Sequence, residues 1–490
     1  MADTVALMKQ RVLDMAIRGE LVEQRSEEGT AEELNKKFQS VGKKKMSKIE
    51  IDKNEKPFDL PSSWMWVRLN EVGEIIGGGT PKTKVDEYWD NGTVPWISPA
   101  DLTGYKKKYI SKGRKNITEL GLKKSSARLM PKGTVLFSSR APIGYVAISS
   151  NEIATNQGFK SVVPYILDTN EYIYYYFQAF LDNIKDRSSG TTFKEISGSE
   201  LGKSVFPLPP LQEQRRIVAK IEEIFAVIDQ IGTKKEEALS IIKNMRQAAL
   251  RDAIMGVLVE QDENDEPASV LYEKIQAEKE KLIKEKKIKK EKLLAEIEVD
   301  EIPFDIPESW KWVRLGYVTN FASHKSVSPS EIEADARLYE LEDIESMSGK
   351  IIQSKSMDDR ISKSNKYVVE AGDILYGKLR PYLNKVACAP EDGYCSTEIF
   401  PLKFYGISEG RFLQYFLRSE YFVEYANRNS QGTKMPRLGS ILGKHAIMPL
   451  PPLAEQERIV EKIEEIMAIC DQMETIFDGT SEMNTNLNVV

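Results

Sequence analysis

The chain has 490 residues, of which 41% are hydrophobic and 29% are charged, and its formal net charge is −6 at pH 7. This composition excludes a chain that is disordered as a whole, and the length allows about three domains. The three cysteines form no CxxC pair, which argues against a disulfide framework, and neither a signal peptide nor an apolar run of roughly 18 residues is present. We therefore expect a cytoplasmic protein that does not enter a membrane.

The charge is unevenly distributed along the chain. Residues 64–203 carry 19 basic and 14 acidic side chains, and residues 310–444 carry 19 and 17, whereas the remainder holds 31 basic and 44 acidic residues. A protein that bound nucleic acid over its whole surface would be basic throughout. The pattern is compatible with nucleic-acid binding by the two mildly basic stretches alone.

The N-terminal segment 5–24 has the spacing of an amphipathic helix that ends near Gly19. Residues 10–24 recur at 247–261 with 9 of 15 positions identical, and the end of the chain corresponds to about position 248 of the first repeat. The repeat is therefore interrupted within a helical region, and the N-terminal segment supplies the second copy of this helix. If the two ends of the chain meet, we expect a closed, pseudo-twofold object.

Two stretches open with nearly the same sequence, and each is expected to begin a domain. FDLPSSWMWVRL (58–69) and FDIPESWKWVRL (304–315) share 9 of 12 positions. Their tryptophans alternate as on a strand, and we interpret them as packing anchors rather than base-stacking residues. They are Trp64, Trp66, Trp310 and Trp312.

The interiors of these two domains combine short strands with one helical aromatic segment. Strands are predicted at 94–98, 133–140, 144–148, 159–164, 372–380, 384–389 and 400–405. The aromatic segments 171–187 and 409–428 follow, and each precedes a Gly-Thr turn, at 188–196 and 430–438. We predict two α+β domains of one fold, flanked by helices, whose differing interiors would serve different targets.

The clearest repeat is PLPPLQEQRRIVAKIEEIFAVIDQ (207–230), which returns at 449–472 with 18 of 24 positions identical. A proline block can open a helix but cannot continue one. The apolar residues that follow are spaced alternately four and three apart, which is typical of a coiled-coil seam, although one copy alone would equally fit an amphipathic core helix. Two copies indicate a tandem repeat. The predicted seam residues are Ile217, Ile221, Ile224, Ile228, Ile231, Ile459, Ile463, Ile466, Cys470 and Met473.

Two lysine-rich stretches, 36–56 and 273–292, lie outside the domains. We interpret the second as a solvated helix in a linker, and a non-specific contact with phosphates is the alternative.

No catalytic or metal-binding motif is recognisable. The tetrapeptide GGGT (77–80) lacks the GK[ST] ending of a P-loop and the context of a dinucleotide site, so we interpret it as a flexible turn. The only histidines, His324 and His445, have no Cys or carboxylate neighbours at metal-ligand spacing. The chain also lacks a GxSxG elbow and the Asn-Pro-Pro-aromatic tetrapeptide of amino-methyltransferases. We expect a recognition or scaffold subunit rather than an enzyme, with neither a cofactor nor a metal of its own.

Together these features resemble the specificity (S) subunit of type I restriction–modification systems over essentially the whole chain. The resemblance rests on the two PLPPLxEQ helices, the LFSSRAPIG…ATNQGF run (136–159), the GTTFKEI and GTKMPRL turns, and the helix ends AIRGELV and AIMGVLV. It implies two target recognition domains, each reading one half of a bipartite, asymmetric DNA sequence. It also implies that long helices separate these domains and pair as an antiparallel coiled coil, and that the chain itself catalyses nothing.

The resemblance further implies the partners. The helices would set the gap between the half-sites on double-stranded DNA and dock two methyltransferase (modification) subunits, which methylate adenine with S-adenosylmethionine. Two restriction/translocase subunits, which use ATP and Mg²⁺, would join through that methyltransferase core. The closest alternative is the specificity subunit of a bifunctional type IIB-like system. A self-contained nuclease and a coiled-coil adaptor that does not touch DNA are the alternatives from other classes.

The same resemblance divides the chain into five parts. They are an N-terminal helix with linker that completes the distal helical region (1–56), target recognition domain 1 (57–206), a central helical region with linker (207–300), target recognition domain 2 (301–448) and the distal helical region (449–490).

Base edges and phosphates are contacted mainly by Arg, Lys, Asn and Gln side chains, which defines the candidates within the two domains. The matching places of the Gly-Thr turns, at Gly190 and Gly432, favour Lys194 and Lys434. The base sequence of each half-site and the length of the gap do not follow from the sequence. The predicted DNA-binding residues are Lys106, Lys107, Lys108, Arg114, Arg140, Asn156, Gln157, Lys194, Lys325, Lys378, Arg380, Lys434 and Arg437.

Overall fold

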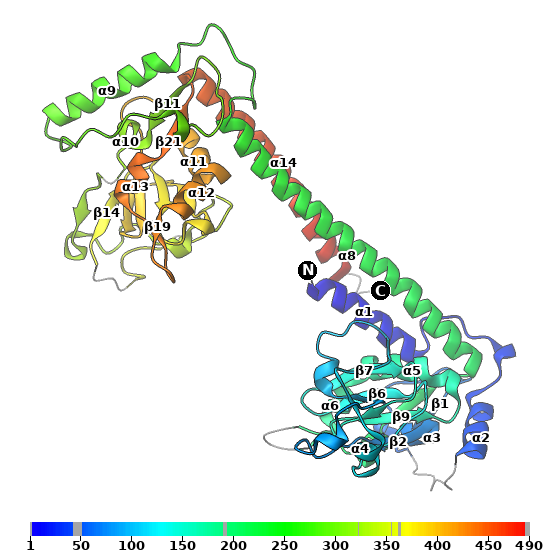
Figure 1. Ribbon diagram of the computed structural model, residues 1–490. Coiled ribbons are helices and arrows are strands. Elements are labelled where there is room, and N and C mark those ends of the chain that lie inside the picture. Colours follow the sequence, from blue (N-terminus) through cyan, green and yellow to red (C-terminus); the bar gives the residue numbers. More distant parts are fainter. Residues whose placement is uncertain are drawn as a thin grey trace. The chain divides into compact units, whose positions relative to one another are not determined.

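The 24-residue repeat begins the two longest helices of the computed structural model, α8 (Leu211–Ile254) and α14 (Leu453–Thr485) (Figure 1). The structure describes residues 2–42, 51–189, 194–321, 323–353, 355–360 and 364–485. It consists of two units, Met1–Lys234 and Lys235–Val490, and α8 starts in unit 1 and ends in unit 2. Each unit contains one α+β domain and one pair of long helices, as the tandem repeat predicts.

Unit 1 is built on a five-stranded sheet with the strand order β2-β9-β6-β7-β4. A three-stranded sheet, β5-β3-β8, and the antiparallel pair β1-β10 complete its strands. Its strands are β1 (Met65–Arg68), β2 (Gly73–Gly77), β3 (Val94–Ile97), β4 (Tyr109–Ile110), β5 (Lys115–Ile117), β6 (Val135–Ser139), β7 (Ile143–Ser149), β8 (Ala154–Thr155), β9 (Lys160–Pro164) and β10 (Val205–Leu208). Besides α8, its helices are α1 (Ala2–Arg18), α2 (Ala31–Val41), α3 (Leu69–Val72), α4 (Glu119–Lys123), α5 (Asn170–Ala179), α6 (Leu181–Asp186) and α7 (Gly198–Gly202).

The aromatic segment of unit 1 forms α5 and α6, and α5 covers the central sheet. Phe137 of β6 stacks on Phe177 of α5, with ring centroids 4.4 Å apart. Tyr172 and Tyr176 are fully buried, and their hydroxyls donate to the backbone oxygens of Pro207 and Val205 in β10. Buried tyrosines need such partners, so this helix fixes the strand that leads into the proline block.

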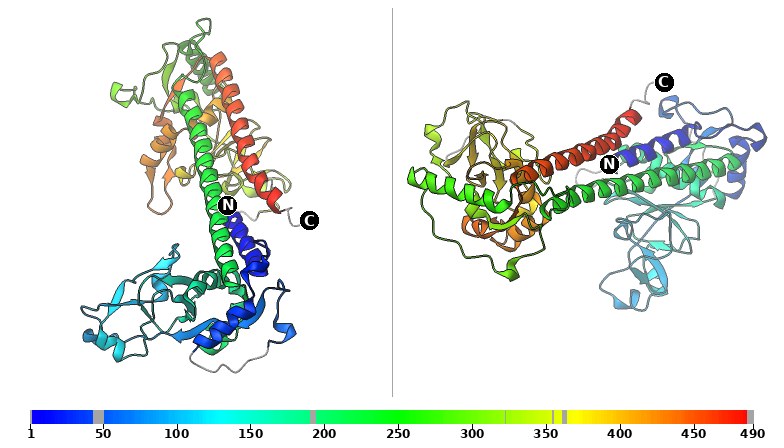
Figure 2. Two further views of the ribbon diagram at one scale, coloured as in Figure 1. Left: turned by 90° about the vertical axis from the view of Figure 1, so that its right-hand side faces the viewer. Right: turned by 90° about the horizontal axis from the view of Figure 1, so that it is seen from above.

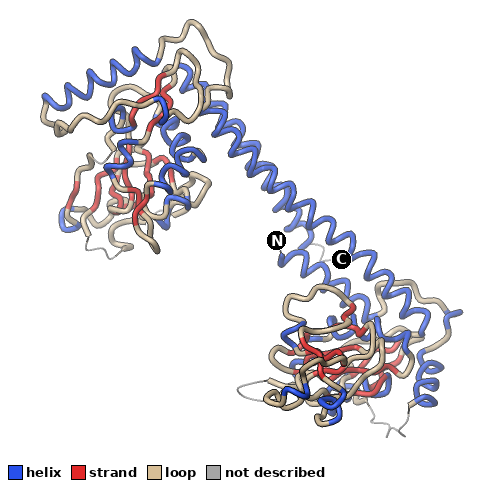
Figure 3. The backbone as a smooth tube through the Cα atoms, in the orientation of Figure 1, coloured by secondary structure: helices blue, strands red, loops and turns tan. Residues whose placement is uncertain are grey.

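Unit 2 repeats this plan with different sheets. Strand β15 lies between β16 and β18, as β6 lies between β7 and β9 in unit 1, and a four-stranded sheet has the order β12-β14-β17-β13. Its strands are β11 (Lys311–Arg314), β12 (Ser326–Val327), β13 (Leu338–Tyr339), β14 (Lys366–Val369), β15 (Ile374–Gly377), β16 (Val386–Cys388), β17 (Gly393–Ser396), β18 (Ile399–Leu402), β19 (Ser430–Gln431), β20 (Arg437–Leu438) and β21 (Ile447–Leu450). Besides α8 and α14, its helices are α9 (Ala268–Lys284), α10 (Leu315–Val318), α11 (Gly410–Arg418), α12 (Glu420–Arg428) and α13 (Ser440–His445). Figure 3 shows the strands of each unit gathered in its α+β domain.

In unit 1 the first part of α8 pairs with α1 in antiparallel orientation (Figure 2). Lys9 forms an ion pair with Asp229 at 2.7 Å, whereas Gln24, just after α1, donates to Glu213 near the start of α8 at 2.6 Å. The seam residues Ile217, Ile221 and Ile228 of α8 are buried, with Val12, Leu13, Ala16 and Ile17 of α1 in the same core. Ile224 is half-buried.

Ile231 departs from the predicted seam, because its side chain is 54% exposed. The physical reason is the length of the partner helix. Gly232, the next residue of α8, lies opposite Val5 in the first turns of α1. The N-terminal end of α1 is therefore at this level, and it leaves Ile231 without a full cover.

In unit 2 the second part of α8 pairs with α14, again antiparallel. Arg246 of α8 donates to Asp471 at 2.7 Å and to Glu474 at 2.9 Å. The seam residues Ile459, Ile463 and Cys470 are buried, and Ile466 and Met473 are half-buried. At the sequence offsets of the repeat, Arg246 corresponds to Lys9 and Asp471 to Asp229, so both units contain the same inter-helix ion pair.

Both helices that precede a domain end at a glycine with positive φ. Gly19 (φ 77°) follows α1 and Gly256 (φ 72°) follows α8 at the matching place in the repeat. A Cβ atom at either glycine would meet a proline ring at about 2.5 Å, on Pro61 or Pro307. Glycine is therefore required both by the backbone conformation and by the close approach of the next domain.

The tryptophans that open each domain are packing residues, as predicted. Trp64 and Trp310 are each 6% exposed, and Trp310 donates its indole N–H to Glu455 at 2.8 Å. Trp66 lies 5.0 Å from the ring of Phe58, and Trp312 lies 5.1 Å from the ring of Phe304. Trp310 therefore joins its domain to a long helix, whereas Trp66 and Trp312 are half-buried and pack against aromatic rings of their own domains.

The second lysine-rich stretch is not the solvated linker helix that was predicted. It forms most of α9, whose residues Leu271 and Ile275 are buried in the core of unit 2. Lys279, 9% exposed, donates to the backbone oxygen of Gly316 at 2.7 Å and lies over the ring of Tyr405. One face of the helix is therefore buried, whereas the opposite face, with Glu273, Lys274 and Glu280, and the residues near the end of the helix are exposed. Part of the first stretch, 43–50, lies outside the described residues.

Candidate nucleic-acid interface

In both units the candidate interface is formed where the end of a central strand lies beside the segment of the predicted Gly-Thr turn, of which residues 190–193 in unit 1 lie outside the described residues. In unit 1 Arg140, just after β6, is bridged to Glu195 of the turn segment, and in unit 2 Leu379, just after β15, is bridged to Arg437. Glu195 and Arg437 occupy matching places in the repeat. The tandem copies therefore build the same two-segment platform from different side chains.

In unit 1 this platform is held by one carboxylate and two cations. Glu195 accepts from Arg140 at 3.4 Å and from Lys160 of β9 at 3.3 Å. Arg140 is 37% exposed and Lys160 is 17% exposed, so the arginine is the side chain that reaches solvent. Lys194 is exposed beside it, whereas Gly190 lies outside the described residues.

In unit 2 the turn carries the cation, and its carboxylate partner comes from a third segment. Arg437 of the turn donates to Glu398, just before β18, with its Nε 3.0 Å from one carboxylate oxygen. The Glu398 carboxylate hydrogen-bonds this guanidinium and raises the pKa of Arg437 further, so the side chain is always charged. Lys434 at the tip of the turn is exposed.

Lys378 and Arg380 line the strand end of the unit 2 platform. The backbone N–H of Arg380 donates to Pro436 at 2.7 Å, and the N–H of Leu438 donates to Lys378 at 3.1 Å. Both Lys378 and Arg380 are half-buried, and the ammonium of Lys378 lies 5.0 Å from the ring centroid of Phe400. The platform thus brings together four predicted DNA-binding residues of unit 2, namely Lys378, Arg380, Lys434 and Arg437.

Lys325 is exposed and lies next to His324, which is stacked on Phe400 with ring centroids 5.2 Å apart. Burial, together with the neighbouring Lys378 and Lys444, lowers the pKa of His324 to about 4. The imidazole is therefore neutral at physiological pH and adds no charge to the surface. Within the described residues, no group of His, Cys, Asp and Glu side chains could hold a metal ion.

Lys108, another predicted DNA-binding residue, is paired with two carboxylates of the protein itself. Its ammonium pairs with Glu171 of α5 at 2.7 Å and also with Glu222 of α8, and the side chain is 17% exposed. Burial alone would lower the pKa of Lys108, but the two carboxylates outweigh it and raise the pKa. Both carboxylates would compete with a phosphate for this ammonium, whereas Lys106 and Lys107 beside it are exposed. DNA binding by Lys108 stays a prediction.

Arg114, Asn156 and Gln157 lie in surface loops of unit 1, and the backbone oxygen of Gln157 joins its loop to the platform by accepting from the ammonium of Lys160 at 3.3 Å. Arg114 is 73% exposed and donates to the backbone oxygen of Ala100 at 2.7 Å. Asn156 uses its side-chain oxygen to accept the N–H of Gly158 at 2.8 Å, which shapes the loop. Gln157 is exposed.

The GGGT segment is not a flexible turn, contrary to the prediction. A Cβ on Gly78 would meet the backbone oxygen of Asn156 at 2.0 Å, and one on Gly79 would meet the backbone nitrogen of Ala127 at 2.3 Å. The backbone oxygen of Gly79 accepts the buried indole N–H of Trp96 at 2.9 Å. The glycines are needed because other backbone segments pass close to them.

Sequence reasoning missed the carboxylates that hold the arginines. Glu195 stands one residue from a predicted DNA-binding lysine, and Glu398 lies 39 residues before Arg437 in the chain. An acidic residue next to Lys194 was the only sequence signal for Glu195. No signal joined Glu398 to Arg437, because the pairing depends on the register between the strand and the turn.

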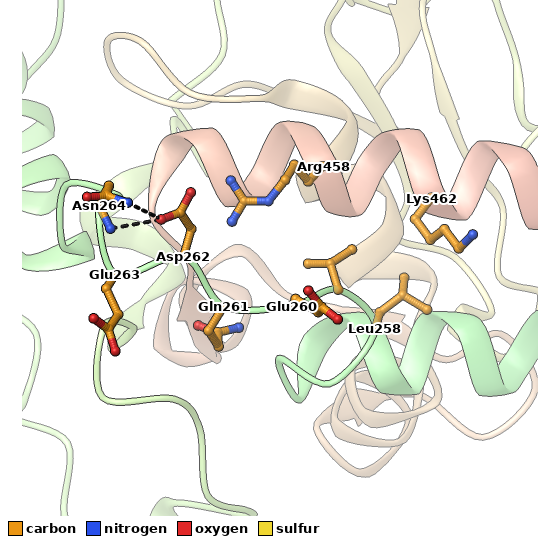
Figure 4. Close-up of a pocket in the computed structure, with 9 residues that line it drawn as sticks. Leu258, Glu260, Gln261, Asp262, Glu263, Asn264, Arg458 and Lys462 are labelled. Atoms are coloured by element: carbon orange, nitrogen blue, oxygen red, sulfur yellow. Dashed lines mark hydrogen bonds between the residues drawn. The ribbon is translucent and has the colours of Figure 1, made fainter.

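The helical part of unit 2 contains an open pocket of about 670 Å³, which is unsuited to a phosphate (Figure 4). Arg458 of α14 is paired with Asp265 at 2.7 Å, so its charge is already compensated. Asp262 accepts from the backbone and the side-chain amide of Asn264, both at 2.9 Å. The lining residues are Leu258, Val259, Glu260, Gln261, Asp262, Glu263, Asn264, Arg458 and Lys462.

Among the helices that the structure describes, none has the length and apolarity needed to cross a bilayer.

Comparisons with known proteins agree with this arrangement. The family model of the type I restriction modification DNA specificity domain matches residues 61–240 and again residues 307–476. The EcoAI type I restriction enzyme specificity subunit of Escherichia coli is 25% identical over an alignment of 557 positions, gaps included, which covers 98% of this chain and 92% of that subunit. The EcoDI specificity subunit of Escherichia coli is 28% identical over 417 residues, which cover 85% of this chain and 84% of that subunit.

A more similar but shorter match is the MjaIX specificity subunit of Methanocaldococcus jannaschii, which is 42% identical over 188 residues. This match covers 38% of the chain and 42% of that subunit, so it concerns less than half of either protein.

Solved structures share the fold. A chain from a structural study of complex assembly and conformational transition in the type I R-M system superimposes with a TM-score of 0.59 at 19% identity, covering 88% of this chain and 97% of that one. The HsdS subunit of Thermoanaerobacter tengcongensis gives a TM-score of 0.50 at 18% identity, with 86% and 93% covered. The two matched segments span most of the chain, so the protein belongs to the family of type I restriction–modification DNA specificity proteins.

Proposed function

We propose that this chain is the DNA sequence-specificity subunit of a type I restriction–modification complex and reads a bipartite, asymmetric target. The observation that carries the proposal is that the family match occurs twice, and each matched segment folds into one recognition domain joined to one antiparallel helix pair. Each domain has its own strand-end and turn platform, with different side chains at matching places. Two different platforms suit two different half-sites.

The helices are the proposed docking surface for protein partners. Outside the two domains the chain is acidic, so the long helices are better suited to protein than to DNA. Because the two units contain the same inter-helix ion pair at matching residues, they offer equivalent surfaces to two copies of one partner. We assign these surfaces to two methyltransferase subunits, through which two restriction/translocase subunits join.

In this proposal the chain is not itself catalytic and acts in the cytoplasm. The methyltransferase binds S-adenosylmethionine, and the restriction subunit binds ATP and Mg²⁺. The similarity to type I subunits favours this partner set over a type IIB-like one. Purified chain incubated alone with DNA and Mg²⁺ is expected to cut nothing.

The test is a methylome. The chain is expressed with the methyltransferase subunit encoded beside it in a methylation-free host, and modified bases are read by long-read sequencing. We expect one bipartite motif with methylated adenines that disappears when the chain is omitted. An assembled complex that produces no motif would instead indicate an adaptor that does not read DNA.

A further inference from the structure

Two exposed apolar side chains stand among the basic residues of the unit 2 platform. Tyr382 is 50% exposed and Met435 is 46% exposed. Tyr382 follows the strand end in a short 3-10 helix (Pro381–Leu383), and Met435 lies in the turn between β19 and β20. Single exposed apolar residues are common, so what distinguishes these two is how they are held and what surrounds them.

The backbone around Tyr382 is fixed in an unusual conformation. Arg380 (φ 52°) and Asn384 (φ 47°), on either side of the 3-10 helix, both adopt the left-handed conformation that non-glycine residues rarely occupy. The side-chain amide of Asn384 donates to the backbone oxygen of Arg418 at 2.9 Å in a buried position. Backbone strain of this kind persists where the surrounding structure imposes it, so Tyr382 is held at the surface.

Met435 is held beside the same loop. Pro436, the next residue, accepts the backbone N–H of Arg380 at 2.7 Å, and Arg437 is bridged to Leu379. The turn between β19 and β20 lies at the far end of the domain from α9 (Figure 1). Loop and turn therefore form one surface, which we call the apical surface of unit 2. It consists of Lys378, Arg380, Tyr382, Lys434, Met435 and Arg437.

The charge of the apical surface indicates the chemistry of its partner. It has four cationic side chains, and the only carboxylate that the structure shows paired with them is Glu398 on Arg437. A net positive surface attracts the phosphates of duplex DNA, but phosphates do not explain two exposed apolar groups. The apolar group that a base pair presents in the major groove is the C5-methyl group of thymine.

We propose that Tyr382 and Met435 contact thymine methyl groups in the half-site read by unit 2 and so help to determine its sequence. This inference rests on the proposed function. Unit 1 supports it by contrast, because Ala141 (φ 47°) and Pro142 stand where Arg380 and Pro381 stand in unit 2. The next residue is Ile143, at the place of Tyr382, and it is half-buried in β7 and packed against the core, so the exposed apolar group at this place belongs to unit 2.

The experiment compares the methylomes of three variants of the full chain, each co-expressed with the methyltransferase. They are Tyr382→Ala, Met435→Ala and a control, Ile407→Ala, which removes another exposed apolar side chain of unit 2. We expect the first two to relax discrimination at an A·T position of one half-site while the other half-site is unchanged. The control is expected to methylate the same motif as the wild type.

A second measurement uses duplexes that carry the motif found for the wild type, with single thymines replaced by uracil to remove one methyl group. Uracil at the contacted position should weaken binding of the wild-type complex about fourfold, which corresponds to the burial of roughly one methyl group. The same replacement should have no effect on the variant that lacks the contacting side chain.

Variants that keep the full wild-type motif, or that lose affinity for uracil duplexes as the wild type does, would overturn the inference and leave the proposed function intact. A wild-type complex without any bipartite motif would overturn both.

Discussion

Glu455 accepts the indole N–H of Trp310 at 2.8 Å, and this bond joins the start of the second recognition domain to the first turn of α14. Gln261, in the segment after α8, donates to the same carboxylate, so three segments meet at one side chain. At the matching place in unit 1, Glu213 accepts from Gln24 at 2.6 Å. The glutamate of the repeated PLPPLxEQ sequence therefore joins the connecting segment to the long helix in each unit, and in unit 2 it also joins the domain.

Replacing this carboxylate should destabilise the protein. Glu455 is 1% exposed, so Glu455→Ala leaves the buried indole N–H of Trp310 without its acceptor and removes the bond from the exposed Gln261. Leaving buried donors unsatisfied costs about 1–3 kcal/mol in the free energy of unfolding. Urea unfolding followed by tryptophan fluorescence measures this loss, with Glu457→Ala, an exposed position on the same helix, as control. Equal losses in the two variants would contradict the prediction.

The pH dependence of stability should include a contribution from Glu55. Arg68 donates to this carboxylate at 2.7 Å, and mainly because of this bond the pKa of Glu55 falls from 4.5 to about 2. A lowered folded-state pKa means that the stabilisation is present above pH 4.5 and is lost as the pH falls towards about 2. Glu55→Gln should therefore destabilise the protein at pH 7. Its difference from the wild type in denaturant midpoint should shrink below pH 4.5, and a difference that is constant with pH would exclude this role.

The sequence predicts the repeat and its long helices well, because these depend on local periodicity. The strands β6 and β15 were also predictable, since each is a short apolar run that follows a glycine. Both strands are buried in the structure. Two-residue strands such as β12 and β19 carry no such pattern and exist only through pairing with distant segments. The closed, pseudo-twofold arrangement in which the two chain ends meet stays a prediction, because the ends belong to different units.

The candidate site was predictable in residue type but not in role. Lys106, Lys107 and Lys108 are indistinguishable in the sequence, yet only Lys108 faces two carboxylates, which belong to α5 and α8. The glycines of GGGT gave the wrong interpretation for a similar reason. A glycine required by a close backbone neighbour has the same sequence signal as a glycine in a mobile turn.

The lysines of the interface can be separated by the salt dependence of DNA binding. Lys434→Ala should weaken binding uniformly across sequences and reduce the slope of log affinity against log salt by about 1, because one phosphate contact is lost. Lys108→Ala should leave that slope unchanged, since Glu171 and Glu222 already neutralise this side chain. Fluorescence anisotropy of the assembled complex at several salt concentrations gives both slopes. A reduced slope for Lys108→Ala would return that residue to the interface.

The matching ion pairs of the two helix pairs should differ in strength. Arg246 is 17% exposed and bonds two carboxylates, Asp471 and Glu474, whereas Lys9 is 28% exposed and bonds Asp229, which is 60% exposed. Arg246→Ala should lower the free energy of unfolding by about 1.5–3 kcal/mol. Lys9→Ala should lower it by about 0–1 kcal/mol, as for surface pairs. Arg246→Lys should restore only part of the loss, because an ammonium lacks the planar fork of donors. Similar losses at Lys9 and Arg246 in urea unfolding would contradict this ranking.

The length of α8 should set the gap between the two half-sites. Thr233 lies between the part of α8 that pairs with α1 and the part that pairs with α14, so an insertion there disturbs neither set of ion pairs. Seven inserted helical residues keep the seam on the same face and add about 10 Å at 1.5 Å per residue. That length corresponds to about three base pairs of DNA at roughly 3.4 Å each. The methylome of this variant should show both half-sites unchanged and the gap about three base pairs longer.

The same seven residues inserted after Lys289, beyond the end of α9, should leave the gap as it was. Intact methylation with an unchanged gap after the α8 insertion would show that the helix does not determine the spacing.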